Sequence, residues 1–265
     1  MRARKPKHIQ ERLVKYSASL ELQPQSCKGK WLAKHCAGAS KLHVDLGCGK
    51  GSFVVESARR NPDHLYIGID SENICIALAA QKAVESGLNN AIFVLANADE
   101  ICDFFADGEV DILHLNFCTP RPKAKHAHLR LTYAQRLNEY AKILKSDSGH
   151  IAFKTDSQPY FDWSLTQFEA AQYKLENVTR DLHSTNIANV LTEYEARLSK
   201  LNAKIHACNA FPPSVEPTEI EQKASMSLGD YLPQDIEGLE SLEYIPYGME
   251  DFVSNKINWL KKHQA

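Results

Sequence analysis

The segment Val44–Gly51, with the sequence VDLGCGKG, constrains this chain more than any other. Three glycines stand at alternate positions directly after an apolar run that carries an acidic residue, Asp45. Glycine accepts positive φ and lets a backbone approach a ligand closely, so the pattern predicts a strand, a tight turn against a ligand, and a helix. The dinucleotide fingerprint GxGxxG requires Gly or Ala where this chain has Ser52. An ordinary strand-to-helix turn is the alternative, and three evenly spaced glycines argue against it.

A second acidic residue points to a ligand that contains a ribose. The apolar run 64–70 ends in Asp70, whose carboxylate suits the hydroxyl groups of a sugar. A strand, a glycine turn, a helix, a strand and an acid in this order resemble the Rossmann-like class I methyltransferases. That resemblance implies S-adenosyl-L-methionine as the cofactor.

The apolar pattern predicts an α/β fold built on a mostly parallel, doubly wound sheet. We expect strands at 42–46, 64–70, 91–95, 110–116 and 149–155, helices at 51–60, 72–86, 99–106, 132–145 and 158–172, and a sheet-like stretch at 174–182. Ligands of such sheets bind beyond the carboxyl ends of the strands. This rule places one cleft at the segment after Asn116 and at Asp45, Asp70, Asn97, Thr155 and Asp156.

Charge is distributed unevenly along the chain. Residues 1–50 contain eleven Lys and Arg and three acidic residues, a net charge of +8, whereas residues 211–265 contain ten acidic residues and four Lys, a net charge of −6. A basic segment suits phosphate binding, and a solvated tail is the alternative. We expect a basic N-terminal arm over 1–40, a methyltransferase domain over 41–210 and an acidic extension over 211–265. The extension ends in an amphipathic helix, which we expect to pack on the core rather than to cover an RNA-binding face or recruit a partner.

Composition favours an enzyme of the cytoplasm. The seven cysteines show no CxxC spacing, which argues against a disulfide framework and against a zinc site, so we expect no metal. No apolar run approaches the ~20 residues of a membrane span. The basic N-terminus lacks the apolar segment of a secretory signal. A monomer and a homodimer are both compatible with the sequence.

Two further segments mark a substrate side. The loop Phe117–His126 carries prolines at alternate positions, which stiffen it, and its Lys123 and Lys125 together with Arg130 suit an anionic partner. The segment Thr192–Glu195 has the Thr-x-x-Glu spacing of a capping box that would start a helix over 193–200. Taken alone, this second segment favours the capping role over a functional one.

Taken together, these blocks resemble the bacterial tRNA (guanine-N7)-methyltransferase family over nearly all of residues 1–208. The Pro-x-Pro-Lys loop combined with Lys-Thr-Asp and Thr-x-Tyr-Glu is the most specific part of the resemblance. The matching blocks are Met1–Arg4, Lys28–Trp31, Val44–Gly51, Asn61–Asp63, Tyr66–Asp70, Leu115–Phe117, Phe153–Asp156, Asp181–His183 and Thr192–Glu195.

The resemblance implies a role for each site residue. Contacts with S-adenosylmethionine are implied for Asp45, Gly47, Gly49, Gly51, Asp70, Asn97 and Thr119. Contacts with the tRNA substrate are implied for Lys123, Asp156, Thr192, Glu193, Tyr194 and Glu195. The expected catalytic residues are Thr119, Asp156 and Glu195.

The proline loop departs from the family pattern, Phe-x-Asp-Pro-Trp-Pro-Lys-Lys-x-His. Thr119 replaces the aspartate and Arg121 replaces the tryptophan. Guanine N7 carries no proton, so its methylation needs no general base, and Asp156 and Glu195 still provide carboxylates. We therefore expect methylation of guanine N7 in tRNA at a reduced rate. The alternatives are a catalytically weakened RNA-binding relative and a small-molecule methyltransferase, and the basic arm and loop argue against the latter.

Overall fold

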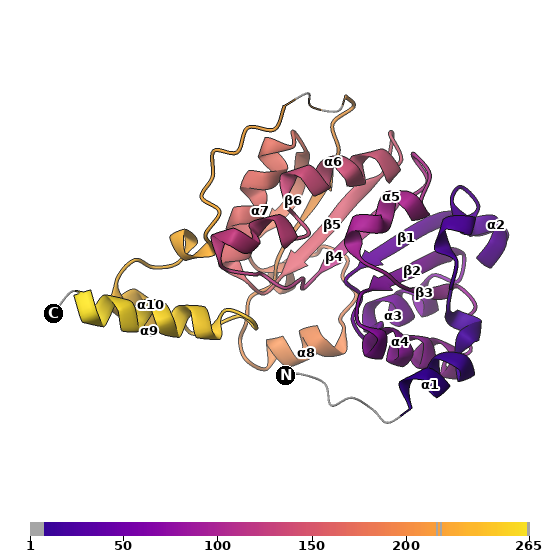
Figure 1. Cartoon of the computed structure of the whole chain (residues 1–265), viewed down its shortest axis with the longest axis horizontal. Helices are drawn as coiled ribbons and strands as arrows, with labels where there is room; N and C mark the ends of the chain where they lie inside the picture. Colours follow the sequence, from indigo (N-terminus) through magenta and orange to yellow (C-terminus); the bar gives the residue numbers. More distant parts are fainter. Residues whose placement is uncertain (1–7, 216, 218, 264–265) are drawn as a thin grey trace. The chain divides into compact units, whose positions relative to one another are not determined.

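The computed structural model describes residues 8–215, 217 and 219–263 (Figure 1). The chain forms two compact units. The first contains the described residues up to 116 together with 139–152 and 188–195, and the second contains 117–138, 153–187 and the described residues from 196 onward. The limits of these two units differ from the domain boundaries that we expected at residues 40 and 210. Those expected boundaries stay a prediction.

Seven strands form one sheet in the order β3-β2-β1-β4-β5-β7-β6. Strand β1 pairs in parallel with β2 and β4, β2 pairs in parallel with β3, and β6 pairs antiparallel with β7. The order reverses between β1 and β4, so the predicted mostly parallel, doubly wound sheet is confirmed. The strands are β1 (Lys41–Leu46), β2 (His64–Asp70), β3 (Ala91–Leu95), β4 (Ile112–Asn116), β5 (His150–Thr155), β6 (Lys174–Thr179) and β7 (His206–Phe211).

The strands alternate with helices along the chain, as βαβ units require. The helices are α1 (Ile9–Lys15), α2 (Trp31–His35), α3 (Ser52–Arg60), α4 (Asn73–Glu85), α5 (Ile101–Phe104), α6 (Ala134–Ile143), α7 (Gln158–Ala170), α8 (Glu193–Ser199), α9 (Ile236–Glu240) and α10 (Glu250–His263). In the first unit, α4 packs against β2 and β3, and α3 packs against β2 and α4 (Figure 1). Within the described residues, no helix is long and apolar enough to cross a membrane.

The N-terminal segment is fixed to the first unit through the Lys28–Trp31 block. The Trp31 side chain is fully buried, and its indole N–H donates to the carbonyl oxygen of Phe104 at 2.9 Å. The backbone N–H of Gly29 donates to Glu109 at 2.8 Å, and Lys28 Nζ donates to the carbonyl oxygen of Cys102 at 2.7 Å. The Lys28–Trp31 block therefore has a structural role. Four basic residues of the expected N-terminal arm lie outside the described residues: Arg2, Arg4, Lys5 and Lys7.

The C-terminal segment folds within the second unit. After β7, a short 3₁₀ turn at Leu228–Tyr231 packs against α7, and α10 packs against α9 and against the same turn. Buried apolar side chains of this segment include Leu228, Met249, Val253 and Leu260. Burial of such side chains stabilises the segment by about 1.5–3 kcal/mol each, so apolar packing holds it within the second unit.

Candidate cofactor and substrate site

The glycine turn between β1 and α3 has the backbone that only glycine adopts readily. Gly47, Gly49 and Gly51 have φ values of 82°, 54° and 70°. The N–H groups of Gly47 and Cys48 donate to the carbonyl oxygen of Ile69 at 2.8 and 3.0 Å, which ties the turn to the end of β2. Three left-handed residues in one turn explain the spacing that the sequence shows.

The glycines of the turn have two different functions. A Cβ at Gly51 would lie 2.6 Å from the Cβ of Ala79 and 2.8 Å from the ring of Phe93, so this glycine permits close packing of α3 on α4 and β3. At Gly49, no atom of the described chain lies within 4 Å of where a Cβ would stand. The backbone at Gly49 therefore borders open space, where a ligand can approach it.

Asp70 holds the glycine turn from the end of β2. Its carboxylate accepts the N–H of Gly49 at 2.9 Å and the N–H of Glu72 at 2.9 Å. Burial raises the pKa of Asp70, and the hydrogen bonds from Glu72 and Gly49 oppose that rise. The residue thus places a carboxylate beside the open side of the turn, which fits a ribose.

Asp45 lies at the point where the strand order reverses. Its buried side chain accepts a hydrogen bond from Asn116 Nδ2 at 3.0 Å, so β1 and β4 are joined there by side chains as well as by the backbone. Ligands of open α/β sheets bind at this switch point. Burial, and then the carboxylates of Asp45 and Asp70, raise the pKa of the neighbouring Cys48 thiol well above its ordinary value. Cys48 therefore stays neutral beside the two acids.

Asn97 follows β3 and is exposed. Its side chain accepts the N–H of Glu100, and its own N–H donates to Glu100 Oε1 at 2.9 Å, which forms a capping box. Asn97 therefore starts the turn Ala98–Glu100, and its cofactor contact stays a prediction.

The loop after β4, in the second unit, carries the substrate-side residues. Phe117 and Arg121 have φ values of 51° and 49°, which are uncommon for residues other than glycine and mark a constrained loop. Thr119, Lys123 and Lys125 of this loop are exposed. Exposure leaves these three side chains accessible to a ligand.

The expectation that Arg130 contacts an anionic partner is wrong. Its side chain is fully buried, and its guanidinium donates to the carbonyl oxygens of Pro120, Arg121 and Pro122 at 3.0, 2.9 and 3.3 Å. It also lies 4.2 Å from the ring centroid of Trp163. Burial lowers its pKa to about 10, so the group still carries its charge at neutral pH. Arg130 holds the loop in shape instead of reaching outward.

Asp156 directly follows β5 and is buried, with 7% of its surface exposed. Its Oδ2 atom accepts a hydrogen bond from the hydroxyl of Tyr244. The sequence predicted Asp156 from its motif and gave no signal for Tyr244, which lies 88 positions further along the chain.

The Thr192–Glu195 segment starts α8, as its spacing predicts. Thr192 Oγ1 accepts the N–H of Glu195 at 3.2 Å, which confirms the capping role. The Glu195 side chain is fully buried and accepts a hydrogen bond from Asn189 Nδ2 at 2.5 Å. Glu193 lies 3.6 Å from Lys82 Nζ, and with Thr192 it borders a pocket of about 350 Å³ on α3 and α4. The predicted substrate contacts of this segment remain untested.

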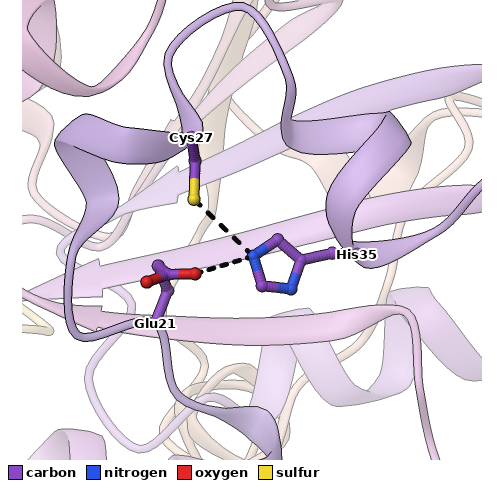
Figure 2. Close-up of side chains that lie close together, drawn as sticks. All are labelled: Glu21, Cys27 and His35. Atoms are coloured by element: carbon purple, nitrogen blue, oxygen red, sulfur yellow. Dashed lines mark hydrogen bonds and ion pairs between the residues drawn. The ribbon is translucent and has the colours of Figure 1, made fainter.

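Glu21, Cys27 and His35 form a group of metal-ligand types in the first unit (Figure 2). His35 Nε2 lies 3.0 Å from Glu21 Oε2 and 3.8 Å from Cys27 Sγ. The ammonium of Lys34 lies 2.6 Å from Glu21 and 3.2 Å from Cys27, so a cation already occupies the group. Burial opposes ionisation of Glu21, but the hydrogen bonds from Lys34 and from the backbone of Gln23 outweigh it and lower its pKa to about 2.

The structure thus brings together Asp45, the glycine turn and Asp70 in the first unit. It holds Thr119 and Asp156 in the second. Comparisons with known proteins indicate what this arrangement does.

Residues 39–208 match the family described as "Putative methyltransferase". The tRNA (guanine-N(7)-)-methyltransferase of Streptococcus thermophilus (strain CNRZ 1066) is 37% identical over 211 residues, which cover 79% of this chain and 98% of that protein. The enzyme of the same name from Geobacillus kaustophilus (strain HTA426) is 38% identical over 215 residues, covering 80% and 98%.

The chain belongs to the tRNA (guanine-N7)-methyltransferase family. The cofactor of this methyltransferase family is S-adenosylmethionine, and the open backbone at Gly49 with the carboxylate of Asp70 fits it. Two solved structures share the fold. The 16S rRNA methyltransferase KamB has a TM-score of 0.54 and 17% identity, and the match covers 69% of this chain and 93% of that chain. An antibiotic-related methyltransferase has a TM-score of 0.50 and 19% identity, and the match covers 69% of this chain and 92% of that chain.

The C-terminal segment distinguishes this member of the tRNA (guanine-N7)-methyltransferase family from the two relatives named above. The family match ends at residue 208, and the alignments already span 98% of the two relatives. The unaligned part of each of these relatives is too short to hold a segment as long as 211–265. The contact of Tyr244 with Asp156 is therefore a feature of this chain.

Proposed function

We propose that this chain transfers the methyl group of S-adenosylmethionine to N7 of a guanine in tRNA. The observation that carries the proposal is the intact glycine turn, open at Gly49 and held by Asp70, within a chain whose match covers 98% of the length of its Streptococcus thermophilus relative. We place this activity in the cytoplasm, where tRNA is the macromolecular partner.

The cofactor side is assigned to residues at the carboxyl ends of the first three strands and after the fourth. These are Asp45, Gly47, Gly49, Gly51, Asp70, Asn97 and Thr119. Asp70 accepts hydrogen bonds from the ribose, while the glycine backbone lets the nucleoside lie close to the turn. When bound, S-adenosylmethionine supplies a methyl group that is activated by a positively charged sulfur.

The substrate side needs to position guanine rather than to remove a proton from it. Asp156 offers carboxylate oxygens for the N1–H and N2–H₂ groups of the base, which fixes its orientation and offsets the positive charge that develops on the purine. Alignment of reactants contributes ~7–11 kcal/mol to such reactions. Glu195 is the second proposed carboxylate. Lys123 is assigned to a phosphate, and Thr192, Glu193 and Tyr194 to further tRNA contacts.

The threonine at position 119 is the reason that we expect a reduced rate of methyl transfer. A threonine hydroxyl accepts a hydrogen bond but carries no negative charge, so it stabilises a developing positive charge less than an aspartate does. The loss of one such contact costs on the order of 2–4 kcal/mol of transition-state stabilisation. We therefore propose an active but slow enzyme.

The test is incubation of the full chain with unmodified tRNA and methyl-labelled S-adenosylmethionine, followed by nucleoside analysis. Label in 7-methylguanosine is the expected result. Label in another nucleoside would contradict the proposed position on the base. No label, with both ligands shown to bind, would support the second candidate, an RNA-binding relative without turnover, which the threonine at position 119 favours.

A further inference from the structure

We propose that Tyr244 and Gly248 of the C-terminal extension complete the substrate half of the site, with Tyr244 acting as a positioning residue for Asp156. This inference rests on the proposed function, because it assigns Asp156 to the guanine. It adds to the site a residue that lies outside the part of the chain shared with the family.

The first observation is the hydrogen bond itself. The hydroxyl of Tyr244 donates to Oδ2 of Asp156, whose side chain is buried. The ring of Tyr244 packs, together with Phe117, against an apolar cluster that includes Leu182 and Ile205. Because that packing fixes the ring, the hydroxyl is held in one place and can fix the orientation of the carboxylate.

The second observation is that the same segment reaches the substituted position of the loop. A Cβ at Gly248 would lie 3.9 Å from Cγ2 of Thr119 and 3.9 Å from Cδ of Pro120. Gly248 has a φ of 87°, and the N–H of Met249 donates to the carbonyl oxygen of Pro246 at 3.0 Å, so a tight turn brings the backbone to Thr119. One short segment thus donates a hydrogen bond to Asp156 and passes beside Thr119, two of the three proposed catalytic residues.

The third observation is that the extension is fixed to this loop directly and through Arg130. Arg130 Nη2, which also holds the loop carbonyls, donates to the carbonyl oxygen of Met226 at 2.9 Å. The N–H of Leu228 donates to the carbonyl oxygen of Pro122 at 3.0 Å. The added segment is therefore hydrogen-bonded to the same loop that departs from the family pattern at Thr119 and Arg121.

These contacts favour positioning over obstruction of the site. Each carboxylate oxygen can accept two hydrogen bonds, so a hydrogen bond from a tyrosine to Oδ2 does not by itself block the carboxylate. A carboxylate that is already oriented loses less conformational freedom when substrate binds and when charge develops. We therefore expect Tyr244 to act on placement of the guanine and on methyl transfer more than on the overall affinity for tRNA, which phosphate contacts dominate.

The test compares Tyr244→Phe, which removes only the hydroxyl, with Tyr247→Phe, which removes the hydroxyl of an exposed tyrosine three positions later. We expect kcat for tRNA methylation to fall about tenfold in Tyr244→Phe. The KM for tRNA, the affinity for S-adenosylhomocysteine and the melting temperature are expected to change little. Tyr247→Phe is expected to match the wild type. A higher kcat in Tyr244→Phe would mean that the segment obstructs the site, and it would overturn the inference.

A double-mutant cycle separates positioning from a general structural effect. In the Asp156→Ala background, Tyr244→Phe is expected to lower the rate no further, because its effect passes through the lost carboxylate. Multiplicative effects of the two substitutions would overturn the inference.

A binding measurement keeps the inference testable if the wild type forms no 7-methylguanosine, which would count against the proposed function alone. Guanosine 5′-monophosphate is then titrated into wild type, Tyr244→Phe and Asp156→Ala in the presence of S-adenosylhomocysteine. Weaker binding in both variants by a similar factor supports the inference. The same behaviour in all three proteins overturns it.

Discussion

At the scale of single residues, Asp70 links the backbone of the glycine turn to the expected ribose site. It accepts N–H groups from both Gly49 and Glu72, so its loss removes a ligand contact and loosens the turn. We expect Asp70→Ala to weaken binding of S-adenosylhomocysteine at least tenfold, since a hydrogen bond to a charged group contributes ~1.5–3 kcal/mol. Isothermal titration calorimetry measures this. Asp63→Ala, an exposed carboxylate just before the same strand, is the matched control. An unchanged dissociation constant for Asp70→Ala would remove Asp70 from the cofactor site.

Thr119 provides a second residue-scale prediction. The side chain is exposed, so an aspartate can replace it without entering the core. Thr119→Asp is expected to raise the rate of 7-methylguanosine formation at saturating cofactor, because it adds a negative charge where the transition state becomes positive. Thr119→Val, which removes the hydroxyl and keeps the shape, is expected to lower that rate. A loss of activity in Thr119→Asp would show that the loop serves a different substrate.

At the scale of elements, β1 carries a buried histidine whose titration opposes folding. His43 Nδ1 lies 3.0 Å from His114 Nε2 on β4, and His43 Nε2 lies 3.2 Å from His64 Nδ1 on β2. Burial, then the neighbouring His64, lowers the pKa of His43 to about 3; Lys41 and His150 also lower it, and Asp111 opposes them. The unfolded chain therefore binds a proton below about pH 6.5 that the folded chain excludes until about pH 3.

Stability should consequently fall as the pH drops from 6.5 towards 3, by up to about 1.4 kcal/mol per pH unit from this group. His43→Gln, which cannot take up a proton, is expected to flatten the dependence when urea unfolding is compared at pH 7 and pH 5. His128→Phe, on the exposed loop, is the control and should leave the slope unchanged. Equal slopes in wild type and His43→Gln would show that other groups control the acid sensitivity.

Elements with strong apolar patterns could be predicted from the sequence, and those that depend on partners could not. The predicted strands 64–70 and 91–95 match β2 and β3 at both ends, and α3 and α4 begin and end within one residue of expectation. Strand β7 was missed because its sequence, HACNAF, mixes polar and small residues without alternation. Its pairing with β6 decides its structure. The predicted stretch 174–182 ends earlier, at Thr179, and is followed by a 3₁₀ turn.

In the candidate site too, some residues could be predicted from the sequence pattern, and others depend on partners that only the fold supplies. Strand ends and the glycine spacing locate Asp45, Asp70 and the turn, because parallel strands present their carboxyl ends at one edge. Charge alone placed Arg130 on the surface, whereas four carbonyl oxygens and the ring of Trp163 hold it inside. Tyr244 carries no motif, and only the folded second unit brings it to Asp156.

At the scale of the whole molecule, the uneven charge predicts how tRNA binding depends on salt. Several cations of the basic first fifty residues are engaged with the chain itself, since Lys28 donates to a carbonyl oxygen and Lys34 pairs with Glu21. Helix α1, which begins at Ile9, packs on α4. We therefore assign much of the salt dependence to Arg2, Arg4, Lys5 and Lys7 before that helix, and to Lys123 and Lys125 on the loop.

Removal of residues 1–7 should flatten the plot of log K for tRNA against log salt. Each phosphate contact contributes a slope of roughly −0.7 to −0.9, so loss of four cations changes the slope by up to about three units. Fluorescence anisotropy with labelled tRNA at several salt concentrations measures the effect. Substitution of Lys261 and Lys262 by alanine removes two charges from the acidic extension and should leave the slope almost unchanged. Binding that is indifferent to salt in the wild type would contradict both the enzyme and the RNA-binding alternative, because each requires a basic surface that displaces counterions.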